Sequence, residues 1–205
     1  MSTRTFVRFA LLALLPLAGA CSPSSSAGND DARTGLVASV MDQATREARK
    51  ALAGEAIQVG KSRQDLPKAT ISPEGELQIG GETVPATPEQ RRLLLEHRAN
   101  IVAVAEAGIL IGTQAADLGL KAAGGALAHA FSGGSSDFEA RMEAEGERIK
   151  DAARELCRQL PPLLDSQQRL AAAMPEFQPY ATLTQQEVDD CFEEKDGHLG
   201  IDVDI

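Results

Sequence analysis

An apolar segment rich in alanine and glycine, residues 99–131, constrains the fold of this chain more than any other feature of its sequence. Its apolar residues lie on nearly every side of a helix, and charged side chains interrupt it only at Glu106, Asp117 and Lys121. A helix that is apolar all round is buried in a protein core or lies in a membrane. Three interpretations follow: a buried central helix of a bundle, a membrane-inserting or self-associating helix, and a loosely ordered stretch.

Small residues recur every four positions within this segment, at Gly108, Gly112 and Ala116. Such spacing lets the backbones of two helices approach closely, so we expect these residues to be helix-packing positions. A spanning helix is disfavoured, because Glu106 and Asp117 would each cost roughly 2.5–3.5 kcal/mol near the bilayer centre. The buried central helix is therefore the favoured interpretation, with the other two as alternatives.

Helical periodicity also predicts a helix over residues 35–57, with its charged side chains off the apolar stripe. The next long helix, residues 88–131, contains the Ala/Gly-rich segment. Thr87 is its expected N-cap, and Gln90 is placed to complete a capping box. The apolar stripe of the first helix consists of Leu36, Val37, Val40, Met41, Ala44, Ala48, Leu52 and Ile57.

A third amphipathic helix, with one strongly charged face, is expected to follow a capping-box pattern over residues 136–139. The Pro161-Pro162 pair is expected to end or kink it, because proline cannot donate the next backbone hydrogen bonds. A further helix is expected up to Pro175, and a last short helix begins after Thr184. The acidic tail, residues 193–205, is expected to be mobile.

The periodicity changes from 3.6 to 2 over residues 68–85, which predicts strands. A Gly80-Gly81 pair is typical of a two-residue hairpin turn, because glycine accepts positive φ. In that register Leu77 faces Val84, and the apolar face of the hairpin needs cover from a helix. We therefore expect a mainly α fold with a small β element, in which antiparallel helices pack on a short β-hairpin or meander.

The first twenty residues have the organisation of an export signal. Arg4 and Arg8 precede an apolar stretch that is too short to span a bilayer comfortably, since about 20 apolar residues are needed. Small residues then lead to Cys21. This ending resembles the lipobox of bacterial lipoproteins, in which the cysteine is diacylated and becomes the new N-terminus. Ser22 is not the Asp associated with inner-membrane retention, so the resemblance implies an outer-membrane anchor facing the periplasm.

Processing after residues 1–20 defines the expected domain organisation. Residues 21–34 are polar and Ser-rich, and they are predicted to form a flexible tether. A single α-rich domain is expected over residues 35–192, and the acidic tail follows it.

The net charge limits the possible partners. The chain has 20 Lys and Arg against 30 Asp and Glu, which gives a formal net charge of −10. Nucleic-acid binding needs basic residues that displace counterions from phosphates, so a nucleic-acid partner is not expected. The same charge argues against electrostatic docking onto anionic lipid. The expected membrane contact is therefore made by the N-terminal acyl chains.

Acylation of Cys21 leaves Cys157 and Cys191 as the remaining cysteines. Export places this pair in an oxidising compartment, where paired cysteines are usually bridged. We expect a structural disulfide that ties the C-terminal segment to the long helix before it. Closing a loop of about 35 residues stabilises the folded state by roughly 4 kcal/mol in the chain-entropy description.

Local motifs of catalysis or metal binding were sought without success. The sequence lacks the G-x-S-x-G, P-loop, G-x-G-x-x-G and H-E-x-x-H patterns. His97, His129 and His198 are isolated in sequence and are interpreted as surface or packed histidines. Glu143 and Glu147 lie one turn apart on a charged helix face and are interpreted as solvated. No catalytic residue, metal, cofactor or small-molecule substrate is predicted, and the chain is not expected to be an enzyme.

The order of these patterns resembles the YggN family of bacterial envelope proteins. The likeness begins with the strand, glycine turn and helix start of residues 69–90 and covers roughly residues 66–192. The resemblance implies an exported α-rich domain with no catalytic residues to carry over. The C-terminal part of the pattern comprises Leu156, Cys157, Gln168, Leu170, Met174, Pro175, Glu176, Phe177, Val188 and Cys191.

Taken together, these features predict a non-enzymatic periplasmic lipoprotein anchored to the outer membrane. Its expected partners are an envelope protein or a second copy of the chain, bound through protein–protein contacts. The alternative is a membrane-active or lipid-binding protein that uses the helix of residues 99–131.

Overall fold

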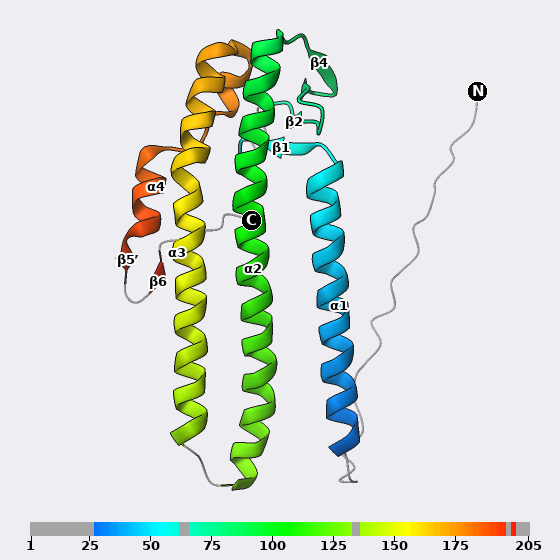
Figure 1. The fold of residues 1–205 in the computed structure, drawn as a ribbon, viewed down its shortest axis with the longest axis vertical. Coiled ribbons are helices and arrows are strands. Elements are labelled where there is room, and N and C mark those ends of the chain that lie inside the picture. The colour runs from blue at the N-terminus through cyan, green and yellow to red at the C-terminus, as the bar shows by residue number, and fades with distance from the viewer. Residues whose placement is uncertain (1–26, 62–65, 133–135, 196–197, 200–205) are drawn as a thin grey trace, which may run out of the picture.

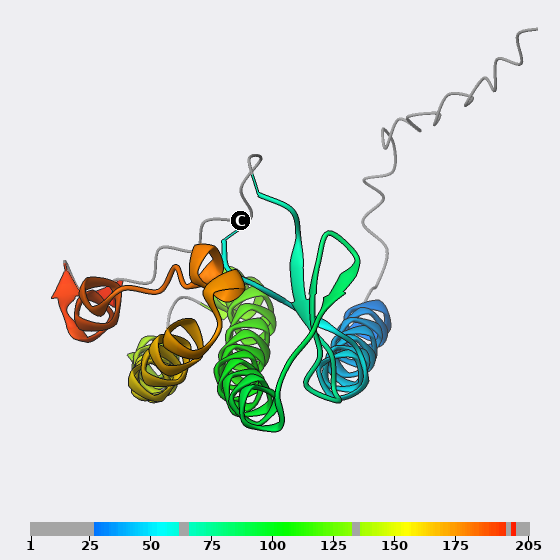
Figure 2. The ribbon, with the colours of Figure 1, turned by 90° about the horizontal axis from the view of Figure 1, so that it is seen from above.

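A computed structural model describes residues 27–61, 66–132, 136–195 and 198–199. Three long helices stand side by side in one row, with α2 between α1 and α3 (Figure 1, Figure 2). A small sheet and a 3-10 helix pack on one end of this row, and we call that end the head. The expected mainly α fold with a small β element is confirmed.

The elements follow one another along the chain with one main sheet. The helices are α1 (Ala27–Gly54), α2 (Pro88–Ser132), α3 (Ser136–Ala173) and α4 (Gln185–Phe192), and the 3-10 helix η1 spans Pro175–Tyr180. Strands β1 (Ile57–Val59), β2 (Ala69–Ile71), β3 (Leu77–Ile79) and β4 (Glu82–Val84) form an antiparallel sheet in chain order. A separate ladder pairs β5 (Glu194–Lys195) with β6 (His198–Leu199).

The predicted start of α2 is confirmed. The backbone N–H of Gln90 donates to Thr87 Oγ1 at 3.2 Å, and the N–H of Thr87 donates to Gln90 Oε1 at 2.9 Å. Thr184 and Glu187 make the same reciprocal contacts at the start of α4. Each capping box satisfies backbone donors that have no partner within the helix.

The hairpin of β3 and β4 has the predicted register. Leu77 pairs with Val84, and both glycines of the Gly80-Gly81 turn have positive φ. The sheet extends beyond the expected hairpin, because β1 pairs with β2 and places Ile57 opposite Ile71. The prediction that the first helix continues to Ile57 is therefore wrong. That strand is three residues long and is defined by its distant partner, so local periodicity does not reveal it.

A tight turn between β2 and β3 packs directly on α2. The N–H of Gly75 donates to the carbonyl oxygen of Ser72 at 3.0 Å, and Gly75 has a φ of +77°. A Cβ at this position would lie 2.7 Å from Cγ of Leu95. Both the backbone conformation and the close approach require glycine here.

The hydrophobic core lies in the head. Side chains from the sheet, from α2, from the end of α3 and from η1 fill the space between these elements. Arg98 is buried beside this core, and its guanidinium donates to the carbonyl oxygens of Leu52 at 2.7 Å and Ile71 at 3.4 Å. The end of α1 and strand β2 are thereby fixed to α2. The core comprises Val59, Ala69, Ile71, Leu77, Leu93, Leu94, Leu170, Met174, Phe177 and Tyr180.

Helix α3 runs through the Pro161-Pro162 pair without ending there. The sequence predicts that the pair ends or kinks the helix; an end is wrong, and a kink stays a prediction. Both prolines are exposed, and the carbonyl oxygen of Pro162 accepts a hydrogen bond from Nδ2 of Asn100 at 3.2 Å. Buried Leu164 and Leu170 beyond the pair hold the continued helix against the core.

The boundaries at the two ends of the domain also differ from expectation. Residues 27–34 belong to α1, so the predicted tether of residues 21–34 is wrong over that part. Asp30 and Asp31 lie near the start of the helix, where negative charge is favourable. In the acidic tail, β5 pairs with β6 over the described residues, and the expected mobility of the tail stays a prediction.

Candidate functional site

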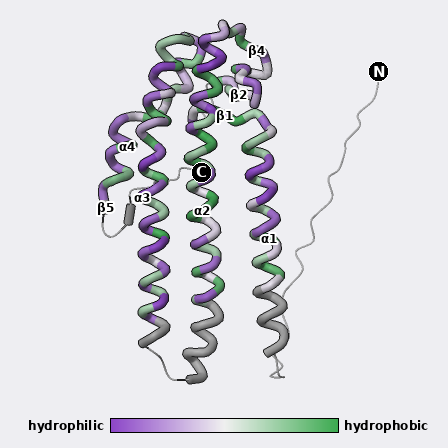
Figure 3. Tube along the Cα trace, in the orientation of Figure 1, coloured by the Kyte–Doolittle hydropathy of each residue, from purple (hydrophilic) through white to green (hydrophobic). Residues whose placement is uncertain are grey.

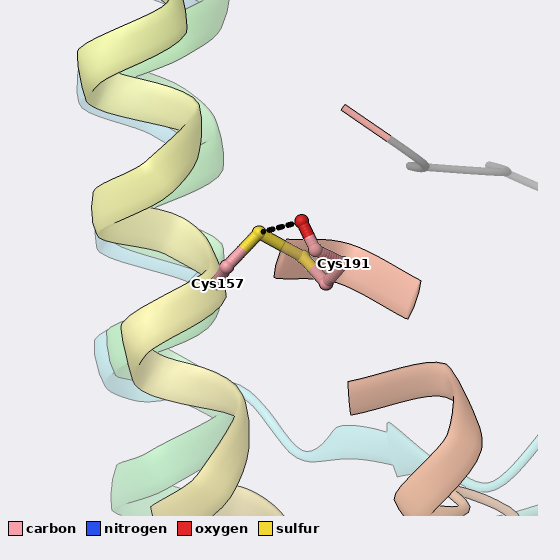
Figure 4. The surroundings of a disulfide bond; sticks show 2 residues. All are labelled: Cys157 and Cys191. Atoms are coloured by element: carbon pink, nitrogen blue, oxygen red, sulfur yellow. Dashed lines mark hydrogen bonds between the residues drawn. A yellow bond between two sulfur atoms is a disulfide. The ribbon is translucent and has the colours of Figure 1, made fainter. Parts of the chain in front are cut away.

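The predicted disulfide joins α3 to α4. The sulfur atoms of Cys157 and Cys191 are 2.06 Å apart, and their Cα atoms are 5.7 Å apart (Figure 4). Both residues are buried. Sγ of Cys157 also lies 2.9 Å from the carbonyl oxygen of Cys191, a contact that is not a hydrogen bond because a disulfide sulfur carries no proton. The position of this pair fits a structural bridge.

Several predicted features fall outside the described part of the chain. Cys21 and the export signal lie in residues 1–26, so lipidation stays a prediction. The side chains of His129 and His198 are likewise not described, and the same holds for the start of the capping box predicted at residues 136–139.

The apolar stripe of α2 is covered only in the head. Leu94 and His97 are buried beneath the sheet and η1, and Ile101 packs against the same core. Gly108 and Gly112 continue this row by helical spacing, yet a Cβ at either position would meet no atom within 4 Å. Among the described residues, the expected close helix packing is therefore absent at these two glycines.

The interpretation of residues 99–131 as a buried central helix is wrong below the head. None of residues 99–122 is buried. Below the head α2 lies between α1 and α3 in the row, and no described element covers its remaining faces there (Figure 2). Among the described residues, the stretch Pro88–Ala122 of α2 is long and apolar enough to cross a membrane by length and composition. Its hydrophobic residues continue along the helix below the sheet (Figure 3).

The apolar stripe of α1 is also exposed near its start. Leu36, Val37, Val40 and Met41 have exposed fractions of 67%, 43%, 58% and 36%. Their expected burial did not occur, because α1 contacts α2 along one side only (Figure 2). Large exposed apolar side chains grouped on neighbouring turns mark an interaction surface rather than scattered surface residues.

Two hollows follow the junction of α1 and α2. The one nearer the head has a volume of about 420 Å³ and is lined by Leu52, Ala105 and Ile109 among others. The other has a volume of about 300 Å³ and brings Met41 and Ala116 together. The predicted helix-packing residue Ala116 thus lines a groove with α1.

We define the open face as the uncovered surface formed by both helices below the sheet. An ion pair joins the two helices beside this surface, with Nε of Arg49 3.0 Å from a carboxylate oxygen of Glu106. Asp42 and Asp117 line the same groove as Met41. The surface itself is therefore apolar, and charges of both signs lie along the junction of the two helices at its side. The open face consists of Val37, Val40, Met41 and Ala44 on α1 and Gly108, Gly112 and Ala116 on α2.

A buried polar pair lies in the head, between α2 and α3. Nδ1 of His97 is 3.0 Å from Oγ of Ser166, and that hydroxyl donates to the carbonyl oxygen of Leu163 at 2.9 Å. Because the serine proton is directed at Leu163, Nδ1 of His97 carries the proton of the shared hydrogen bond. The ring also makes an edge contact with Phe177, with ring centroids 5.4 Å apart. Burial lowers the pKa of His97 to about 4.

The direction of these hydrogen bonds does not suit nucleophilic catalysis. A serine nucleophile must donate its proton to the histidine base, whereas Ser166 accepts a hydrogen bond from Nδ1 of His97 and directs its own proton at Leu163. Ser166 is also only 1% exposed, so a substrate cannot reach its oxygen. Among the described residues, no group of three His, Cys, Asp or Glu side chains could hold a metal ion.

His97 is the residue whose surroundings the sequence indicated least. It was interpreted as a surface or packed histidine, and it is packed. Its spacing from Leu94 and Ile101 places it on the buried stripe, and this spacing was the available signal. Its partner Ser166 comes from a helix 69 positions away in sequence, so no local pattern could reveal the pair.

A scan against protein-family models, a search of curated proteins and a search of solved structures each find no match. The functional inference therefore rests on the sequence and the structure.

Proposed function

We propose that the chain is a periplasmic lipoprotein of the outer membrane, held by acyl chains on Cys21, with a structural, non-enzymatic role. In this proposal the open face binds a second copy of the chain. The observation that carries it is the uncovered row of α2, where the helix spacing typical of close packing meets no neighbour. The resemblance to the YggN family is compatible with this role.

A second copy suits the open face better than lipid does. Glu106 and Asp117 lie beside the apolar residues, and each would be costly in hydrocarbon. A second copy offers small residues for close approach and, from Arg49, a charge opposite in sign to Glu106 and Asp117. Two-fold dimers use the same patch twice, so a face of apolar and small residues can complement itself.

Anchoring is tested by fractionation of a Cys21→Ser variant. We expect the parent protein to sediment with outer membranes and the variant to remain soluble, because the variant cannot be acylated. A variant that stays membrane-bound like the parent would show that lipid does not hold the protein.

The binding surface is tested by cysteine crosslinking and by solution mass. In a full-length Cys21→Ser background, we expect Gly112→Cys to give a covalent dimer on mild oxidation. Gly146→Cys on α3 is the matched control, because a Cβ at either glycine meets no atom within 4 Å. We further expect Val40→Asp to abolish the dimer in light scattering. A monomeric parent that forms no crosslink at position 112 would overturn the proposal.

A second candidate function is lipid binding through the same helix. It is favoured by the apolar composition of Pro88–Ala122. In the most apolar part of that stretch, no residue is buried. Flotation of the Cys21→Ser protein with phospholipid vesicles separates the two functions. Lipid binding predicts flotation that Gly112→Leu alters, whereas self-association predicts a dimer that does not float.

A further inference from the structure

A cavity of about 280 Å³ lies in the head, on the side of α2 that faces α3 and η1. Val59, Ile101 and Leu163 give it apolar walls. Lys61 and Glu187 line its outer part, and Nζ of Lys61 is 2.8 Å from a carboxylate oxygen of Glu187. This cavity is separate from the open face.

One buried polar group opens into the cavity. His97 lines it and is only 4% exposed. Its Nδ1 is used by Ser166, whereas its Nε2 has no hydrogen-bond partner among the described residues. Gln114 Oε1 is the one fully enclosed side-chain polar atom without a partner in the described part of the chain. Nε2 is therefore accessible, and the cavity gives that access.

Neighbouring polar side chains in the cavity wall already have partners. The hydroxyl of Tyr180 donates to the carbonyl oxygen of Pro67 at 2.8 Å. The amide of Gln167 bonds both backbone groups of Leu183, at 2.8 and 3.0 Å. Nε2 of His97 thus remains as a buried acceptor for a ligand, and the hydroxyl of Thr182 lines the same cavity.

The charge of the cavity favours an uncharged ligand. Burial keeps the His97 ring neutral at pH 7, because its pKa falls to about 4. Lys61 and Glu187 neutralise each other in their ion pair. A charged ligand would lose its hydration without gaining an unpaired counter-charge. The volume is at the lower limit for small-molecule pockets, so the ligand is small.

We propose that this cavity binds a small uncharged molecule with an apolar body and a hydroxyl or N–H group that donates to Nε2 of His97. Apolar walls with one fixed polar partner are the usual composition of such sites. The proposal does not depend on the proposed function, because it uses none of the residues of the open face.

Phenol serves as the probe, and toluene is the matched control that lacks the donor. We expect phenol to bind the purified full-length protein about tenfold more tightly than toluene, because one hydrogen bond separates the two. The measurement is the ¹⁵N chemical shift of the His97 ring during each titration. Phenol should move the Nε2 signal, and toluene should leave it nearly unchanged.

A variant confirms which atom is responsible. His97→Phe keeps an aromatic ring but removes the acceptor, so phenol and toluene should then bind equally. If this variant does not fold, the ¹⁵N shifts of the His97 ring in the parent protein show whether phenol contacts Nε2. Two results would overturn the proposal. The parent protein could bind phenol and toluene equally, or it could bind neither at millimolar concentration because the cavity holds water only.

Discussion

At the scale of single residues, His97 gives the head a dependence on pH. The ring takes up a proton near pH 6.5 in the unfolded chain, but burial lowers its pKa to about 4 in the folded protein. The unfolded state therefore gains protons as the pH falls from 6.5 to about 4, and the folded state is destabilised over that range.

We expect the free energy of unfolding to fall by about 2 kcal/mol between pH 7 and pH 5 because of this residue. Three carboxyl groups also have lowered pKa values and affect stability at lower pH. These are Glu96, Glu145 and Glu187, and the chief causes are their hydrogen bonds to Arg169, Lys121 and Lys61, respectively. Urea titrations of the parent and of His97→Phe at both pH values measure the effect. An equal fall in both proteins would contradict this prediction.

Arg98 holds three elements together, and its loss should be costly. Arg98→Met removes the donors to Leu52 and Ile71 while it keeps most of the buried volume. Since hydrogen bonds from charged groups contribute roughly 1.5–3 kcal/mol, we expect a loss of that size in urea unfolding. Arg148→Met is the control, because the Arg148 side chain is 71% exposed and its change should matter little.

At the scale of elements, the disulfide fixes α4 to α3. Replacing both Cys157 and Cys191 by alanine should lower the free energy of unfolding by roughly 4 kcal/mol, because the unfolded chain gains freedom. Denaturant unfolding of the double variant checks this value, with Cys21→Ser as the variant that should leave stability unchanged. Labelling of the unreduced protein should find neither Cys157 nor Cys191 reactive.

Elements with a local cause were predicted well from the sequence. Thr87 with Gln90 and the Gly80-Gly81 turn need only their own neighbours, and both form as expected. Strand β1 and the continuation of α3 past Pro161 depend on distant partners and on exposure to water. Periodicity carries neither kind of information, so these two predictions failed.

At the scale of the whole molecule, the head and the lower, uncovered part of α2 should differ in local stability. The core cluster is confined to the head, whereas residues 105–122 have no buried side chain. For the monomer we expect amide hydrogens of residues 93–101 to exchange most slowly and those of residues 105–122 faster by at least tenfold. Hydrogen exchange with mass spectrometry measures this difference at several protein concentrations.

A concentration dependence would link exchange to the open face. Dimer formation through Gly108 and Gly112 should slow exchange in residues 105–122 as concentration rises, while Gly112→Leu should remove that effect. Uniform protection of the whole of α2 at low concentration would contradict the contrast between head and lower helices. The sequence could not predict this contrast, because apolar character alone does not say what covers a helix.

The early start of α1 gives the proposed lipoprotein a fixed reach. Ala27 lies six residues after Cys21, at the end of the helical row opposite the sheet (Figure 1). A helix of 28 residues is about 40 Å long, so an anchor at Cys21 would hold the sheet at about that height above the lipid. The three helices then act as a spacer that sets the distance at which the head meets other periplasmic molecules. Removing two turns of α1 would lower this height by about 11 Å.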